Sequence, residues 1–112
     1  MKTSELTDRA LDWAVAKCEG REVRAWAVHR RLGRCDYSTN WSQGGPIIER
    51  ERIDVLGMVR GEIGPWTACL RKKDEAPPWR HIAEGPTPLV AAMRCFVLSR
   101  LGDEVEIPEE LQ

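Results

Sequence analysis

Apolar positions follow a helical period near each end of the chain. In residues 6–20 they recur at i, i+3, i+4 and i+7 and form one stripe made of Leu11, Ala14, Val15 and Cys18. Thr7 is a suitable N-cap for this segment, and Asp8 suits the positive end of the helix dipole. Gly20 supplies a residue that readily turns left-handed at the far end. The pattern therefore predicts a helix within residues 6–20.

A second, wider apolar face covers residues 88–101. Its members recur at helical spacing and are Leu89, Met93, Phe96, Val97 and Leu101. Thr87 is the expected N-cap, and Pro88 takes the first helical position, where its missing N–H costs nothing. Gly102 follows the last turn. A helix over residues 88–101 is predicted.

Three shorter segments between the helices have the β-branched or alternating composition of strands: residues 22–28, 53–59 and 66–71. The Gly64-Pro65 pair predicts a break before the third of them. Residues 47–52 follow Pro46 and are expected to form one or two helical turns. Most connections are too short for helical crossovers, so we expect a mainly antiparallel sheet.

The predicted fold class is therefore α+β. Residues 1–112 are expected to form a single small α/β sandwich, with a short, mainly antiparallel sheet and flanking N-terminal and C-terminal helices. Residues 103–112 are an acidic tail in which Val105 and Ile107 alternate with other residues. We expect this tail to form a strap or short edge strand that frays at its end.

Composition and charge narrow the functional classes. The formal net charge is -1, from 17 Lys+Arg and 18 Asp+Glu, which argues against a nucleic-acid coat or a polybasic membrane binder. No segment has the roughly 20 apolar residues that cross a bilayer, and the N-terminus lacks a signal-peptide core, so we expect a cytoplasmic protein without a membrane partner. Four cysteines without a Cys-x-x-Cys pair predict reduced structural thiols, and we expect neither a metal site nor a cofactor.

Residues 37–46 carry the chemistry of a candidate ligand site. Tyr37 and Trp41 could stack on a base or another flat ring, and four polar side chains offer directional hydrogen bonds: Ser38, Thr39, Asn40 and Gln43. Gly44 and Gly45 stand before a predicted helix start, where their amides can approach a ligand closely. The alternative interpretation is a surface turn whose Trp41 packs back onto a core that contains few large apolar residues.

The segment Gly85-Pro86-Thr87-Pro88 repeats the order of glycine, proline and helix start. An exposed helix start offers unpaired N–H groups and a partial positive charge, which suit a phosphate or carboxylate. Beside the first loop it would complete a pocket with aromatic walls and an anion-binding rim. The alternative is that Thr87 only caps its own helix. Neither segment is a Walker loop or a Rossmann fingerprint.

Catalytic and nucleic-acid-binding interpretations have less support. His29 and His81 belong to no recognisable Ser-His-Asp or Cys-His arrangement, and Glu49 and Glu51 fall on different faces of a helix, so we expect no enzyme. Basic residues near Trp26 could form a groove for a single strand: Arg21, Arg24, Arg30, Arg31 and Arg34, with Arg71-Lys72-Lys73 as a second cluster. The acidic tail and the net charge weigh against that groove.

Three blocks of the chain carry a family resemblance: LTDRALDWAVA (6–16), YSTNWSQGGPIIERE (37–51) and GPTPLVAAMR (85–94). Together they resemble a family of small proteins encoded by tailed phages and prophages, some of them NinX-like. The resemblance implies a phage-derived accessory protein of α/β sandwich type in the cytoplasm of the bacterial host. It implies no activity and no catalytic residues. Residues 52–81 carry little of the pattern.

The favoured hypothesis is a non-catalytic phage protein that binds a small anionic, nucleotide-like ligand and could sequester a nucleotide signal of host defence. The expected ligand-binding residues are Tyr37, Ser38, Thr39, Trp41, Gln43, Gly44, Gly45 and Thr87, with Arg50 or Arg94 as the counter-charge. A second copy of the chain, in a homo-oligomer, is expected to complete the pocket, because one small domain rarely encloses a nucleotide alone. The alternative is an accessory protein that binds single-stranded nucleic acid or another protein.

Overall fold

The computed structural model describes residues 1–21, 35–59, 62–71 and 80–111. Within these residues there are three α-helices: α1 (Asp8–Cys18), α2 (Trp41–Glu51) and α3 (Pro88–Leu101). Three strands form one antiparallel sheet in the order β1-β2-β3: β1 (Asp54–Val59), β2 (Glu62–Arg71) and β3 (Arg80–Gly85). Short 3₁₀ helices lie near the chain ends: η1 (Thr3–Glu5) and η3 (Glu109–Leu111). The predicted α+β class with an antiparallel sheet and flanking terminal helices is confirmed.

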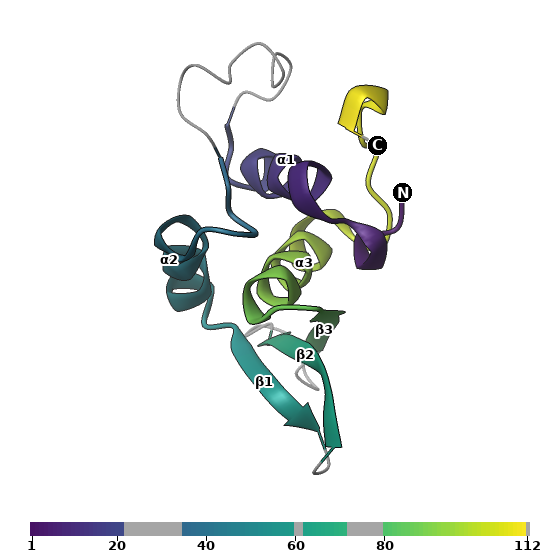
Figure 1. Cartoon of the computed structure of the whole chain (residues 1–112). Coiled ribbons are helices and arrows are strands. Elements are labelled where there is room, and N and C mark those ends of the chain that lie inside the picture. Colours follow the sequence, from purple (N-terminus) through teal and green to yellow (C-terminus); the bar gives the residue numbers. More distant parts are fainter. Residues whose placement is uncertain (22–34, 60–61, 72–79, 112) are drawn as a thin grey trace.

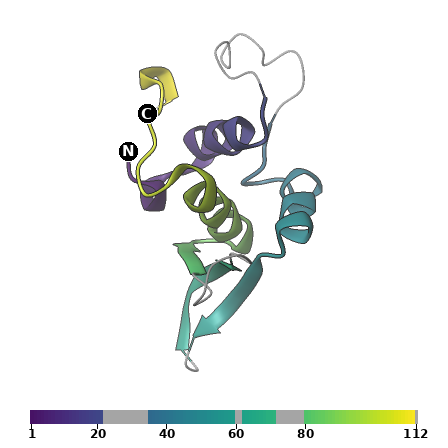
Figure 2. The same ribbon diagram turned by 180° about the vertical axis from the view of Figure 1, so that it is seen from behind.

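Helix α3 is the centre of the structure. It lies on one face of the sheet, and α1 and α2 both pack against it (Figures 1 and 2). Nine consecutive residues of α3, from Leu89 to Val97, are buried. A helix that is buried around its whole circumference has to be apolar on every side. Among these nine residues only Arg94 is charged, which makes it the exception that the fold has to accommodate.

Local capping explains where the two predicted helices begin and end. Thr87 caps α3, since its side-chain oxygen accepts a hydrogen bond from the backbone N–H of Val90 at 3.1 Å. Thr7 holds the equivalent position before α1, but its side chain makes no capping hydrogen bond. Gly20, at φ +78°, follows α1 in the left-handed conformation that the sequence predicts. Both helices are confirmed.

The sheet confirms two predicted strands and corrects one boundary. Residues 53–59 contain β1, and residues 66–71 belong to β2. The break expected at Gly64-Pro65 is wrong, because β2 already begins at Glu62. The register shifts between Leu56 and Met58, opposite this stretch, and such an irregularity tolerates a proline without an N–H. The strand expected at residues 22–28 lies outside the described residues, and β3 was not predicted.

The segment predicted as a glycine loop is instead the first half of α2. The helix begins at Trp41, before the Gly-Gly-Pro sequence, rather than after it. Asn40 caps it, with its side-chain oxygen accepting from the Ser42 backbone N–H at 2.9 Å and from the Ser42 hydroxyl at 2.6 Å. This strong cap starts the helix early, and Pro46 is therefore carried inside the helix rather than in its first turn.

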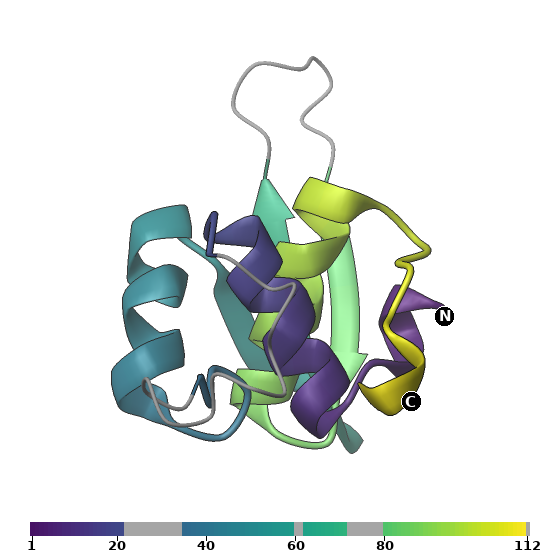
Figure 3. The same cartoon turned by 90° about the horizontal axis from the view of Figure 1, so that it is seen from above.

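The two ends of the chain lie side by side (Figure 3). Lys2 and Glu104 form an antiparallel bridge, and the Thr3 hydroxyl donates to the Gly102 carbonyl at 2.5 Å. Val105 and Ile107 are buried, which confirms the predicted strap. The expected frayed end is corrected for residues 109–111, which form η3 with Leu111 buried.

Candidate ligand-binding site

The turn before α2 is tightly packed rather than open. Tyr37 and Ser38 are 6 % and 2 % exposed, and the Ser38 backbone N–H donates to the Asp12 carboxylate of α1 at 2.8 Å. Gly44 lies directly against the Tyr37 carbonyl and the Leu89 side chain, so that a Cβ there would meet them at 2.5 and 2.6 Å. The turn and the start of α3 are therefore adjacent, as expected, but side chains fill the space between them.

The glycine amides are not available in the way the sequence suggested. The Gly44 N–H donates to the Asn40 carbonyl at 3.0 Å, and Gly45 lies inside the same helix. The Gln43 side-chain oxygen accepts from the Asp36 backbone N–H at 2.7 Å. Since helix formation uses these groups, the expectation of a glycine loop with free amides is wrong.

Trp41 remains a surface residue. Its side chain is 55 % exposed, and its ring lies 4.0 Å from the position of a Cβ on Gly45. The neighbouring Thr39 is also exposed. The alternative interpretation of a tryptophan packed into the core is therefore wrong. An aromatic face is therefore accessible at the start of α2, but the backbone N–H groups of Gly44 and Gly45 belong to the helix.

Arg50 and Thr87 have structural partners. Arg50 forms a two-pronged hydrogen-bonded pair with Glu19 at 3.0 and 2.9 Å and a further bond to Glu51 at 3.0 Å. These bonds, first those to Glu19, hold the pKa of Arg50 above its usual value. Thr87 caps its own helix, as the alternative interpretation expected. Both residues therefore take part in contacts that stabilise the fold.

Arg94 is buried without an acidic partner. Its side chain donates from Nε to the Leu6 carbonyl at 2.8 Å and from Nη1 to the Glu84 carbonyl at 2.8 Å. Both acceptors are neutral, and no carboxylate within the described residues pairs with the guanidinium. Burial lowers the pKa of Arg94, with no opposing effect from an acid. A guanidinium has five N–H donors, so three remain beyond the two hydrogen bonds.

Arg94 faces a cleft of about 800 Å³ between the N-terminal segment, β3 and α3. The cleft is lined by parts of the chain that are far apart in sequence: residues 2–4, Pro65, residues 82–86, Arg94, Leu98 and residues 103–104. Arg94 is the single residue of the predicted ligand set in this lining. The other residues that form the cleft were not expected from the sequence, because it is the pairing of the chain ends that brings them together.

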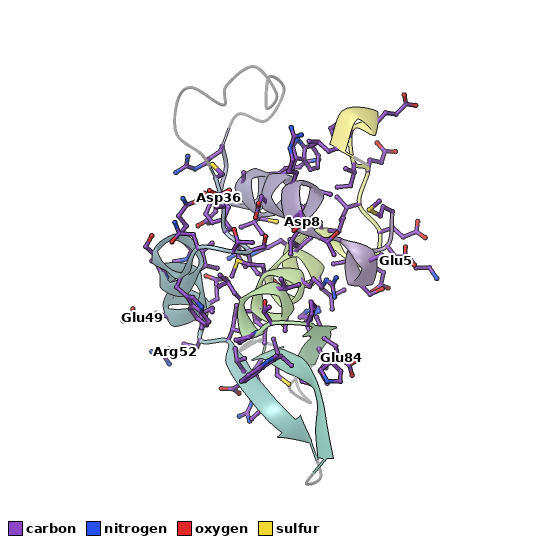
Figure 4. The ribbon with its side chains drawn as sticks, in the orientation of Figure 1. Glu5, Asp8, Asp36, Glu49, Arg52 and Glu84 are labelled. Atoms are coloured by element: carbon purple, nitrogen blue, oxygen red, sulfur yellow. The ribbon has the colours of Figure 1, made fainter. Side chains whose placement is uncertain are left out.

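The predicted site is therefore divided between two sides of α3. Leu89 points toward α2, and Arg94 follows five residues later, about 140° further around a helix of 3.6 residues per turn. Figures 1 and 3 show α2 and η1 on opposite sides of α3. In Figure 4 Glu49 marks the α2 side, whereas Glu5 and Glu84 mark the side of the cleft. The expectation that Arg94 neutralises a ligand stacked on Trp41 is wrong.

A buried carboxyl was missed by the sequence analysis. Asp12 is 5 % exposed, and its burial raises its pKa from 3.8 to about 6, against the opposing effect of the Ser38 amide. The Ser38 hydroxyl, also buried, has no hydrogen-bond partner among the described residues. The available signal was the position of Asp12 within the otherwise apolar run from Leu11 to Ala16.

The described part of the chain contains no helix long and apolar enough to cross a membrane. Its His, Cys, Asp and Glu side chains form no group of three or more that could hold a metal ion. All four cysteines are free thiols.

Comparison with known proteins identifies the family. No curated protein matches the chain. The family model described as "Bacteriophage P22, NinX" matches residues 2–100, which include Trp41, Arg94 and every helix and strand from η1 to β3. The match covers most of the chain, which therefore belongs to the phage NinX family.

Proposed function

We propose that the protein is a non-catalytic binding protein that takes up a small anionic ligand in the cleft beside Arg94. The observation that carries the proposal is the Arg94 guanidinium, 9 % exposed, hydrogen-bonded to two neutral carbonyls and without an acidic partner in the described structure. This charge faces the cleft rather than the apolar core alone. An anion in the cleft would supply the counter-charge that the fold does not.

The energetics of a buried charge support this assignment. Taking a guanidinium out of water costs several kcal/mol, and neutral hydrogen-bond acceptors recover only part of that cost. A carboxylate or phosphate can accept two parallel hydrogen bonds from one guanidinium, and such charge-assisted bonds are about twice as strong as neutral ones. Since Leu6 and Glu84 use only Nε and one N–H of Nη1, three N–H donors remain for a ligand, two of them on Nη2.

The size of the cleft suits a small molecule. Its volume of about 800 Å³ is in the range of small-ligand sites, so that a nucleotide-like molecule fits. The apolar part of such a ligand would contact Pro65, Ile82 and Leu98 rather than Trp41, which does not line the cleft. In an infected cell, binding without turnover would sequester the ligand, and a nucleotide signal of host defence is one candidate.

Ligand release tests the proposal. The wild-type protein is purified, denatured and analysed by mass spectrometry for small molecules, beside Arg94→Lys and two controls, Trp41→Ala and Arg50→Lys. We expect an anionic ligand from the wild type and both controls, and a loss of at least tenfold with Arg94→Lys. Retention by Arg94→Lys together with loss by Trp41→Ala would place the site on α2 and overturn the proposal.

A second measurement covers the case in which Arg94→Lys does not fold. The Nε–H resonance of Arg94 in ¹⁵N-labelled wild type is followed while the ligand-stripped protein is titrated with the released molecule. We expect this resonance to shift saturably, while that of Arg50 stays in place. No shift of the Arg94 resonance at saturation would show that the ligand binds elsewhere.

The nucleic-acid alternative stays a prediction. Of the basic residues on which it depends, only Arg21 and Arg71 lie within the described part of the chain.

A further inference from the structure

Besides Arg94, the charged residues that line the cleft are mostly acidic. They are Glu84, Asp103 and Glu104, with Lys2 as a single base. All four side chains are exposed. None of them forms an ion pair or side-chain hydrogen bond within the described part of the chain. We call these four exposed residues the rim of the cleft. Three acids against one base make the rim negative, whereas the buried Arg94 is positive.

The rim is held in place by the paired chain ends. The Thr3 hydroxyl donates to the Gly102 carbonyl at 2.5 Å, and the Thr3 N–H donates to the Asp103 carbonyl at 2.8 Å. The bridge between Lys2 and Glu104 continues this pairing. Glu84 is positioned by β3, and its carbonyl accepts from Arg94. These bonds therefore hold the backbone of the rim residues beside Arg94 and the cleft.

Such a charge arrangement distinguishes between anions. A ligand with one negative charge can place it on the guanidinium and leave the rim to its uncharged or positive parts. Each further negative charge has to lie nearer the rim, where it is repelled by the three carboxylates. Two unit charges about 8 Å apart interact by about 1 to 2 kcal/mol at effective dielectric constants of 20 to 40, which corresponds to about tenfold in affinity per additional charge.

Resting on the function proposed above, we infer that the cleft selects a dipolar ligand: one anionic group that binds Arg94, and at the other end a cationic or N–H-donating group that binds the rim carboxylates. Amino groups on a heteroaromatic ring, or an ammonium, have the required chemistry, because a carboxylate accepts their hydrogen bonds. Pro65, Ile82 and Leu98 contact the apolar middle of the ligand. Polyanions such as nucleoside triphosphates bind more weakly, because the rim repels their additional charges.

A series of adenine nucleotides tests the inference, because its members share one base and differ in charge. Adenosine 3′,5′-cyclic monophosphate, AMP and metal-free ATP carry about one, two and four negative charges at neutral pH. Their binding to the ligand-stripped protein is measured by calorimetry at low salt. We expect the cyclic nucleotide to bind at least tenfold more tightly than ATP. The triple variant Glu84→Gln, Asp103→Asn, Glu104→Gln should reduce or reverse that preference.

A matched triple variant controls for net charge. Glu49→Gln, Glu106→Gln, Glu109→Gln removes three exposed acids that do not line the cleft, and we expect it to keep the wild-type order. ATP binding more tightly than the cyclic nucleotide to the wild type, in an Arg94-dependent way, would overturn the charge selection but leave the proposed function intact. A released natural ligand with two or more negative charges would do the same. If no nucleotide binds and no anion is released, both fail.

Discussion

Replacing Asp12 by asparagine tests what the burial of this carboxyl costs. Asp12 lies on α1 and accepts a hydrogen bond from the Ser38 backbone N–H at 2.8 Å. Its pKa is raised from 3.8 to about 6, mainly by burial and to a smaller extent by the nearby Asp36 and Asp8. An asparagine keeps an oxygen that can accept from Ser38. It also replaces the second carboxylate oxygen with an uncharged N–H₂ group beside the Ser38 side chain.

The sign of the effect follows from linkage. Folding raises the pKa of Asp12, so the folded protein holds the proton more tightly than the unfolded chain does. The corresponding stability is fully present below about pH 3.8 and is lost as the pH rises through about 6. The shift of about 2.2 pH units, at 1.36 kcal/mol per unit, sets an upper limit of about 3 kcal/mol for the cost of ionised Asp12. Relaxation around the carboxylate reduces it, so we expect about 1 to 3 kcal/mol.

Urea unfolding between pH 4 and pH 8 measures this effect. We expect Asp12→Asn to be about 1 to 3 kcal/mol more stable than the wild type at pH 8, and to differ little from it at pH 4. Thermal unfolding should show a rise in Tm of about 4 °C per kcal/mol. Glu49→Gln on the exposed side of α2 is the control and should leave the pH dependence unchanged. A variant that is less stable than the wild type at pH 8, or a stability difference that does not vary with pH, would refute the reasoning.

Three further predictions concern packing, capping and thiol reactivity. Gly44→Ala should lower the free energy of unfolding by about 1 to 3 kcal/mol in the same urea assay, because its Cβ would lie 2.5 Å from a backbone oxygen. Gly45→Ala is the control: the nearest atom would be 4.0 Å away, so we expect a neutral effect or a stabilisation of up to about 1 kcal/mol. Thr87→Val should cost about 1 kcal/mol by removing a cap, and Thr7→Val should cost clearly less, since Thr7 makes no capping bond; equal losses would contradict this. Burial raises the pKa of Cys95 to about 12, so iodoacetamide at pH 8 should alkylate it only as fast as the protein unfolds, as peptide mapping can show.

The helices at the two ends could be predicted because their signals are local. For α3 the cap at Thr87, the proline at the first position and the glycine after the last turn all agree with the apolar period. The start of α2 was predicted incorrectly because two local signals competed. Pro46 indicated a helix start behind it, but Asn40 provides the stronger cap, and Gly44 is required for close contact with Leu89 rather than for a loop.

Strand β3 could not be recognised from the sequence because its large apolar residue is exposed and its small residues face the core. Ile82 is 54 % exposed, whereas Ala83 and Gly85 face α3. A Cβ on Gly85 would lie 2.7 Å from the Ala91 backbone nitrogen, so that the position requires a glycine. The close approach of β3 to α3 therefore requires small residues on the buried face of the strand. A search for alternating large apolar residues does not detect such a strand.

The candidate site was predicted only in part, and for a similar reason. Arg94 was one of two arginines, with Arg50, that the sequence offered as a counter-charge, and it stands within the buried run of α3 from Leu89 to Val97. Its surroundings could not be predicted, since the Leu6 and Glu84 carbonyls and the rim acids come from opposite ends of the chain. The exposed Trp41 belongs to the predicted loop, but it begins α2 and does not line the cleft that contains Arg94.

The position of Arg94 argues for a ligand more strongly than its charge alone does. An arginine that served only to connect Leu6 and Glu84 would be a costly way to satisfy two carbonyls, because taking a guanidinium out of water costs several kcal/mol and neutral acceptors recover only part of it. An arginine that binds an anion has to be buried enough to form strong hydrogen bonds, and some of its N–H donors have to remain accessible to the ligand. Arg94 meets both conditions, since the backbone holds its inner donors and the cleft borders the rest. Because the anion would bind only the folded state, it would increase the free energy of unfolding and offset part of the destabilisation caused by the buried charge.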